Sequence, residues 1–258
     1  MSCTRKLPLL ALAVALVAPV HGAEKKDEKT NAPPRITMAL PFAVVPGVTN
    51  KIIVRGISLT NATEIRFPSS ELKPVVEISS RGKANVPDKA DPKKLGDTQL
   101  EVRLWLPPDF AAGDLPFIVN TPGGDTNTNL LQVVAKALLL DEQEPNPGFR
   151  KANPVALPQT VRGVIGEASD VDVFRFRGNA GQRISIITKS TRYGSSLDPI
   201  LNLYDAKGHV LATSDDTTGL DARITAVLPR DESYFFAIND AHDRGGATYG
   251  YVVEIRSE

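Results

Sequence analysis

The feature that most constrains the fold of this chain is a strict alternation of side-chain types over residues 170–177, Asp-Val-Asp-Val-Phe-Arg-Phe-Arg. Successive side chains of an extended chain point to opposite faces, so Asp172, Phe174 and Phe176 share one face and the residues between them share the other. Such alternation, with β-branched and aromatic residues, is typical of a half-buried antiparallel strand. Glycines flank the segment on both sides, which predicts turns at its ends. The segment therefore predicts one strand of a β-sandwich.

The same alternation recurs towards the C-terminus. Ile184 and Ile186 share a face of one candidate strand, and Tyr251, Val253 and Ile255 share a face of the last one. About eight short strands at regular spacing indicate a sandwich or jelly roll. Their predicted bounds are 159–164, 172–176, 182–188, 200–204, 210–213, 223–228, 233–238 and 249–255.

The first half of the chain also consists of short apolar runs, separated by many of the 20 prolines and 19 glycines. This spacing favours an all-β chain with many turns. We expect the polar, lysine-rich residues 79–95 to form a long exposed loop. Residues 129–140 either finish the sandwich as a strand or contain a helical turn. The predicted strands are 36–40, 51–54, 64–67, 75–78, 99–106 and 117–119.

An acidic, proline-broken segment at residues 141–148 separates the two halves, and such a composition marks a domain boundary. A chain of 258 residues is long enough for two modest domains, each with its own core. The predicted fold class is therefore all-β, with two consecutive β-sandwich domains. They occupy residues 35–134 and 154–258, joined by a linker at 135–153.

The N-terminus reads as a secretion signal at residues 1–22. Arg5 and Lys6 form a basic head, an apolar run follows, and small residues end the segment. The apolar run is shorter than the roughly 20 residues that a spanning helix needs, although a retained anchor is the alternative. Residues 23–34 are charged and then proline-rich, and we expect a disordered leader there. We therefore expect a secreted or periplasmic protein, or one at the cell surface, with no membrane span after signal removal.

The net charge limits the kinds of partner that the chain can bind, and the cysteine content limits its disulfides. The chain has 30 basic and 30 acidic residues. Removal of Arg5 and Lys6 leaves 28 basic residues and a formal charge of about −2, so no basic excess points to a nucleic acid. The single cysteine, Cys3, lies in the predicted signal. The exported chain would contain no disulfide, although export permits them.

The first half resembles an IPT/TIG-type immunoglobulin-like domain. The resemblance covers roughly 95 residues and implies a strand, a glycine bend, a strand and a closing hairpin. It is carried by Pro46-Gly47, by residues 52–59 and 63–67, and by residues 112–114 before the turn at 121–127.

The second half resembles the bacterial pre-peptidase C-terminal (PPC) domain. In that family the pattern implies a secreted β-sandwich that is accessory to exported enzymes, often peptidases; this chain has no peptidase domain beside it. The residues that carry the resemblance are 144–146, 163–166, 170–176, 180–182, 194–199, 203–205 with Gly208, 214–216, Asp221, and 228–229 before 234–235.

The sequence contains few combinations of residues that could form a catalytic site. Outside the signal, the only histidines are His209 and His242, both in polar turns. No Gly-x-Ser-x-Gly motif occurs, and no cysteine outside the signal can act as a nucleophile. We therefore predict no catalytic residue, no enzyme activity and no cofactor other than calcium. A hydrolase that uses loop carboxylates is the alternative.

Loop aspartates are the candidate metal ligands. Calcium prefers six to eight oxygen ligands, and Asp205, Asp215, Asp216 and Asp221 lie in turns between predicted strands. The alternative is that these aspartates cap turns of the backbone. Four aromatic residues are candidates for outward-facing rings that stack on a sugar or a peptide: Trp105, Tyr193, Tyr204 and Phe235. The alternative is that these rings cover the second face of a sheet or a domain junction.

Together these features predict a non-enzymatic binding protein that contacts an extracellular or envelope protein or polysaccharide. The alternative is an accessory or targeting subunit of a separately encoded secreted peptidase or carbohydrate-active enzyme. The sequence does not identify the ligand-binding residues.

Overall fold

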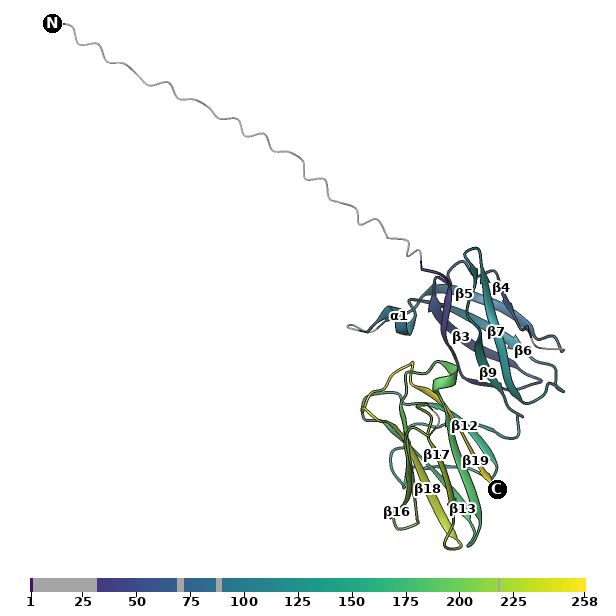
Figure 1. Cartoon of the computed structure of the whole chain (residues 1–258), viewed down its shortest axis with the longest axis vertical. Coiled ribbons are helices and arrows are strands. Elements are labelled where there is room, and N and C mark those ends of the chain that lie inside the picture. Colours follow the sequence, from purple (N-terminus) through teal and green to yellow (C-terminus); the bar gives the residue numbers. More distant parts are fainter. Residues whose placement is uncertain (2–31, 69–71, 87–89, 218) are drawn as a thin grey trace. The chain divides into compact units, whose positions relative to one another are not determined.

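A computed structural model describes Met1 and residues 32–68, 72–86, 90–217 and 219–258. The predicted signal and most of the predicted leader lie outside these ranges. The described chain is almost entirely β-structure, as predicted (Figure 1). No helix in these ranges is long and apolar enough to cross a membrane.

The first sandwich consists of two sheets. One has the order β1-β3-β6-β5, and the other has the order β2-β9-β7-β4 with β8 paired to β7. Alternate residues of β6 point inward, and Leu100, Val102 and Leu104 pack with Phe117 in the core between the sheets. The strands are β1 (Arg35–Leu40), β2 (Ala43–Val44), β3 (Thr49–Ile57), β4 (Glu64–Arg66), β5 (Val75–Lys83), β6 (Thr98–Trp105), β7 (Gly113–Thr121), β8 (Gly124–Asp125) and β9 (Asn129–Val133).

The second sandwich has sheets of order β10-β12-β19-β14-β17 and β11-β13-β18-β15-β16. Phe174 and Phe176 of β13 are buried in its core, as their alternation predicted, and so is Asp172. The strands are β10 (Leu139–Asp141), β11 (Asn153–Pro154), β12 (Gln159–Val164), β13 (Val171–Gly178), β14 (Arg183–Lys189), β15 (Pro199–Tyr204), β16 (Val210–Ser214), β17 (Arg223–Val227), β18 (Glu232–Asp240) and β19 (Gly250–Ser257).

Two segments differ from the expectations, and residues 129–140 take the strand alternative. Residues 79–95 are not one loop, because β5 continues to Lys83 and a short helix, α1 (Pro92–Leu95), follows. Their polar side chains are compatible with an edge strand, which has one face and one edge in solvent. Residues 129–140 contain strands and no helix. The segment predicted as a linker contains β10 and β11, which pair in parallel with β12 and β13.

The described residues from 32 to 258 belong to one compact unit, and side chains of both sandwiches meet within it. Tyr193, in the short 3-10 helix η1 (Thr191–Tyr193), stacks on Phe42 with ring centroids 5.4 Å apart. Its hydroxyl donates to Asp114, at 3.0 Å. Gly194 has a positive φ of 88°, and a Cβ there would lie 2.0 Å from the carbonyl oxygen of Thr37. This close approach of two backbones requires glycine at position 194.

Candidate functional site

Three carboxylates, Glu142, Glu144 and Asp172, form what we call the inner acidic cluster. One oxygen from each lies within 4.8 Å of the others. Asp172 comes from β13, where the alternation of the strand directs its side chain into the sandwich. The two glutamates follow β10 directly in the chain. The pairing of β10 with β12 therefore brings the segment that follows it to the buried aspartate.

Tyr251 of β19 links the two more buried members of the cluster. Its hydroxyl lies 2.5 Å from Oε2 of Glu142 and 2.7 Å from Oδ2 of Asp172. The backbone N–H of Val164 donates to the other oxygen of Glu142, at 2.7 Å. Glycine at position 163 leaves the space for this arrangement, since a Cβ there would lie 2.1 Å from Glu142 Oε2 and 2.4 Å from the Tyr251 hydroxyl.

The cluster carries more negative charge than its surroundings offset. Burial and the neighbouring Glu142 raise the pKa of Asp172 to about 10. Burial also raises the pKa of Glu142. A phenol donates only one proton, so Tyr251 cannot satisfy both carboxylates at once. The cluster therefore needs a bound proton or a bound cation at neutral pH.

Two buried side chains of this region, Asp172 and Asn146, have atoms without hydrogen-bond partners among the described residues. Asp172 is fully buried, and its Oδ1 has no hydrogen-bond partner among the described residues. Asn146 is also fully buried, and neither its side-chain oxygen nor its nitrogen has a partner there. The backbone N–H of Asn146 donates to Glu144, at 2.9 Å, which places it beside the cluster. Carboxylate and amide oxygens are the ligands that calcium prefers, so the donor set fits a hard divalent cation.

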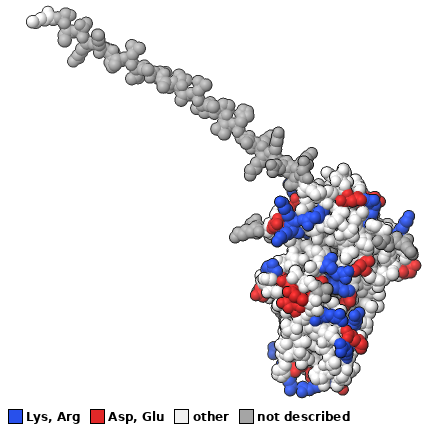
Figure 2. Space-filling model, viewed as in Figure 1, with Lys and Arg blue, Asp and Glu red and all other residues white. Residues whose placement is uncertain are grey.

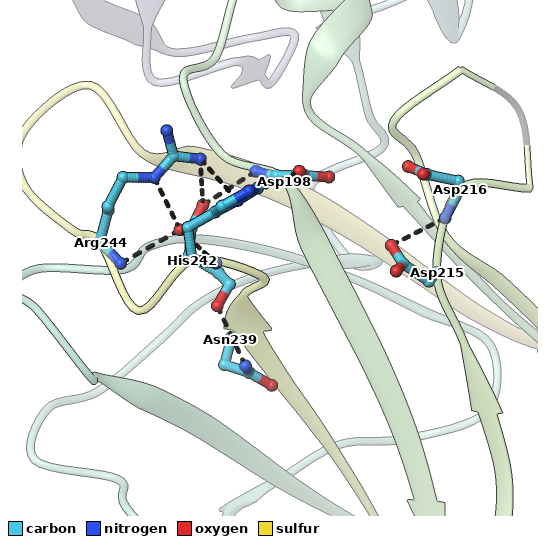
Figure 3. A network of polar contacts seen from close by, with 7 residues as sticks. Asp198, Asp215, Asp216, Asn239, His242 and Arg244 are labelled. Carbon is cyan, nitrogen blue, oxygen red and sulfur yellow. Dashed lines mark hydrogen bonds and ion pairs between the residues drawn. The ribbon is translucent and has the colours of Figure 1, made fainter.

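A second group, the outer acidic cluster, consists of Asp198, Asp215 and Asp216, whose oxygens also lie within 4.8 Å of one another. Figure 3 shows Asp215 and Asp216 on one side of Asp198, and His242 with Arg244 on the other. His242 Nδ1 is 3.5 Å from Asp198 Oδ2. Burial, and then Asp216 and Asp215, raise the pKa of Asp198.

The fully enclosed carboxylate next to this group is Asp240, at the end of β18. It accepts hydrogen bonds from the Arg244 side chain, at 3.0 Å, and from the backbone N–H groups of Asp198, His242 and Arg244. Burial raises the pKa of Asp240, but these hydrogen bonds, first that from the Arg244 side chain, outweigh burial and lower it. Asp240 therefore organises the loop, and its charge is already balanced.

The four aspartates predicted as calcium ligands do not form one site. Asp215 and Asp216 lie together in the outer cluster, whereas Asp221 accepts from the backbone N–H of Ser190, at 2.8 Å, and from its hydroxyl, at 2.6 Å. Asp205 accepts from the backbone N–H of Lys207 and from the His209 ring, each at 2.9 Å. The hydrogen bond from His209 lowers the pKa of Asp205 to about 2. Asp221 and Asp205 thus cap turns, which is the alternative reading of these residues.

Of the four predicted outward-facing aromatic residues, Trp105 lies on the surface, with 36% of its area exposed. Tyr193 is fully buried and Phe235 is 8% exposed, so neither ring faces outward. Tyr193 packs at the junction of the two sandwiches and Phe235 lies on the second face of its sheet, which is the alternative for these residues. Phe149, from the segment between β10 and β11, covers Phe235, with ring centroids 4.4 Å apart, and also contacts the half-buried Tyr204. Alternation along a strand cannot show that another part of the chain covers the second face of its sheet.

A groove of about 610 Å³ opens beside the inner acidic cluster. One wall carries outward-facing residues of the β1-β3-β6-β5 sheet, including Lys51, Ile53 and Arg103. The other wall carries Arg162 of β12 and Glu142. Sequence reasoning did not single out the inner cluster, although the inward position of Asp172 in its alternating strand was a usable signal.

Comparisons with known proteins place the chain only loosely. No protein-family model matches it. It is 37% identical over 106 residues to a protein of Deinococcus radiodurans named as a probable subtilase-type serine protease, a match that covers 40% of this chain and 15% of the length of that relative. The PPC domain of a collagenase from Bacillus anthracis is a similar solved structure, with 14% identity, a TM-score of 0.36, and coverage of 45% of this chain and all of that one. PliG of Aeromonas hydrophila, a periplasmic inhibitor of g-type lysozyme, has 13% identity, a TM-score of 0.33, and coverage of 46% and 96%.

Proposed function

We propose that this chain is a non-enzymatic binding module that acts outside the cytoplasm, at the cell envelope or in the medium. The observation that carries the proposal is a set of exposed apolar side chains on the outer face of the β1-β3-β6-β5 sheet. Its side chains include Trp105, Val75 and Ile53, which are 36%, 62% and 42% exposed. Exposed apolar groups that lie together on one face are typical of interaction surfaces.

The domain types belong to the same proposal. We assign the second sandwich to the PPC type because its turn motifs occur in the order of that family, and the first sandwich to the IPT/TIG type on its glycine and proline turns. The predicted signal at residues 1–22 supports export. The identity to a segment of a protease favours a second candidate function, that of an accessory subunit of a separately encoded secreted peptidase.

The inner acidic cluster would hold calcium in this module. Glu142, Glu144 and Asp172 would supply carboxylate oxygens, and Asn146 its amide oxygen. The cation would neutralise the excess buried charge and tie the segment after β10 to β13. Its role in this proposal is structural stabilisation, and no reaction is assigned to it.

The proposal is tested by capture from a native envelope fraction on the immobilised chain without residues 1–22. We expect a defined envelope protein or polysaccharide to be retained, and retention of a peptidase would favour the accessory role. The same preparation is screened for hydrolysis of casein and of aryl glycosides, with His209→Ala and His242→Ala as controls. Hydrolysis that persists on purification and is lost in either variant would contradict a non-enzymatic function.

A further inference from the structure

The outer face of the β1-β3-β6-β5 sheet presents three neighbouring strands to solvent. In the register of this sheet, Trp105 of β6 lies between Thr49 of β3 and Val75 of β5. Directly opposed residues of neighbouring strands have their side chains in contact range. Two further rows follow along β6, centred on Arg103 and Glu101. At the last row β5 has a bulge, where the Ser79 hydroxyl donates to the carbonyl oxygen of Glu101. We call this surface the Trp105 face; it consists of Thr49, Lys51, Ile53, Val75, Glu77, Ser79, Glu101, Arg103 and Trp105.

Trp105 is the only tryptophan of the chain, and with 36% of its area exposed it is less covered than Tyr193 or Phe235. Tyr193 packs against Phe42, and Phe235 packs against Phe149. Trp105 instead stands beside Val75, the most exposed valine on this face, at 62%. A flat aromatic ring with an exposed apolar neighbour offers a stacking surface with a polar N–H at its edge.

The charged side chains around the Trp105 ring carry no net charge. Lys51 and Arg103 oppose Glu77 and Glu101, and Arg103 lies 3.7 Å from Glu77. Figure 2 likewise shows basic and acidic side chains interspersed on the visible surface, with no extended area of one sign. A polyanion needs an excess of basic groups, which this face lacks. Alternating donors and acceptors suit a neutral ligand that carries many hydroxyl groups.

The Trp105 face also has the length of an extended ligand. Trp105, Arg103 and Glu101 are successive outward residues of β6, and the row spans about 14 Å at 3.4 Å per residue. Glu101, Arg103, Lys51 and Ile53 also line the groove of about 610 Å³. A chain that stacks on Trp105 can therefore continue along β6 into a concave, partly apolar site.

We propose that the Trp105 face and the adjoining groove bind a neutral polysaccharide chain. Trp105 stacks on a sugar ring, and Arg103, Lys51, Glu77 and Glu101 form hydrogen bonds with hydroxyl groups. The inference rests on the proposed binding function and names the ligand class. A peptide or an anionic polysaccharide is the competing occupant.

The lone tryptophan makes the test direct, since any change in tryptophan fluorescence comes from this face. The chain without residues 1–22 is titrated with mixed-linkage β-glucan, galactomannan and alginate, and sedimented with cellulose, chitin and peptidoglycan. We expect saturable binding to at least one neutral polysaccharide, with a fluorescence change where it is soluble. Trp105→Ala should weaken binding by about tenfold or more, as removal of a central aromatic contact usually does.

Two further variants keep the test decisive. Arg103→Ala should weaken the same binding with the fluorophore intact, so it serves where Trp105→Ala does not fold, as judged by circular dichroism. Val227→Ala removes an apolar side chain that is 59% exposed on β17, and it should bind as the wild type does. Binding to alginate alone, or equal binding by the wild type and both face variants, would overturn the inference.

Envelope capture separates this inference from the proposed function. If Trp105→Ala captures an envelope partner as well as the wild type does, the binding function stands and the Trp105 face is not its site. If the wild type captures nothing and binds no polysaccharide, both proposals fail.

Discussion

The two acidic clusters of the second sandwich have the same number of carboxylates, three each, but differ in how their charge is offset. In the inner cluster Asp172 is fully buried, and no lysine, arginine or histidine pairs with its members within the described part of the chain. In the outer cluster Asp215 and Asp216 are exposed, His242 lies beside Asp198, and Arg244 neutralises the adjacent Asp240.

This comparison teaches that a count of acidic groups does not identify a metal site. Exposed carboxylates are solvated and screened, so they tolerate one another at little cost. Buried carboxylates without a counter-charge are costly, and unpartnered oxygens beside them add to that cost. The inner cluster meets both conditions at Asp172, although Glu144 is exposed. The outer cluster also has an unpartnered buried oxygen, Asp198 Oδ1, but His242 lies beside Asp198 and the other two carboxylates are exposed. We therefore expect the two clusters to respond differently to cations, pH and substitution.

The largest expected effect is that of calcium on thermal stability. At a calcium concentration about 100 times the dissociation constant, binding to the folded chain contributes about 2.7 kcal/mol. A domain pair of this size should then melt about 5–10 °C higher. Differential scanning calorimetry at pH 7.5, with calcium and then with a chelator, measures the shift. Asp172→Asn should abolish it and Asp215→Asn should preserve it; loss of the shift in Asp215→Asn alone would assign the ion to the outer cluster.

The second effect is a dependence of stability on pH in the presence of a chelator. The pKa of Asp172 rises from 3.8 to about 10 on folding. A group whose pKa is raised by folding stabilises the protein below its unfolded pKa, and that contribution is lost as pH rises towards the folded pKa. We expect stability to fall by several kcal/mol between pH 4 and pH 10. Denaturant unfolding across this range should give a flatter profile for Asp172→Asn, and an unchanged profile would remove Asp172 as the cause.

A smaller effect is expected from Tyr251→Phe, which removes the hydroxyl between Glu142 and Asp172. One of the two carboxylates beside this hydroxyl would lose its hydrogen-bond donor, at a cost of about 1.5 kcal/mol. The matched control is Tyr249→Phe, because the hydroxyl of this neighbouring, half-buried tyrosine makes no hydrogen bond within the described ranges. Urea unfolding of the pair measures the difference, and equal losses in both variants would show that ring packing, not the hydroxyl, is responsible.

The smallest effect should come from the outer cluster. Asp216→Asn removes an exposed charge that raises the pKa of Asp198, and surface changes of this kind usually stay within about 0.5 kcal/mol. We expect unchanged or slightly higher stability, read from the same unfolding curves. A loss of more than about 1 kcal/mol would show that Asp216 belongs to a stabilising site in the outer cluster, which we expect only in the inner cluster.

Local sequence patterns were enough to predict the strands. They were not enough to predict which segments pack on each face of a sheet. The alternation at 170–177 correctly placed Phe174 and Phe176 in a core, because the period of two along a strand is a local property. It did not reveal that Phe149 covers Phe235, since that contact joins residues far apart in the chain. Residues 79–83 were expected in a loop because an edge strand with one solvated face has the composition of a loop.

The sequence by itself determined the fold class, most of the strands, the turn positions and the identity of the inward-facing residues, including Asp172. Only the tertiary structure decided which carboxylates meet, because Glu142 and Asp172 are brought together by the pairing of β10 with β12 and by the hydroxyl of Tyr251. The same holds for the aromatic rings. Exposure depends on what the rest of the chain covers, and of the four rings first considered, Trp105 is the one left on an open face.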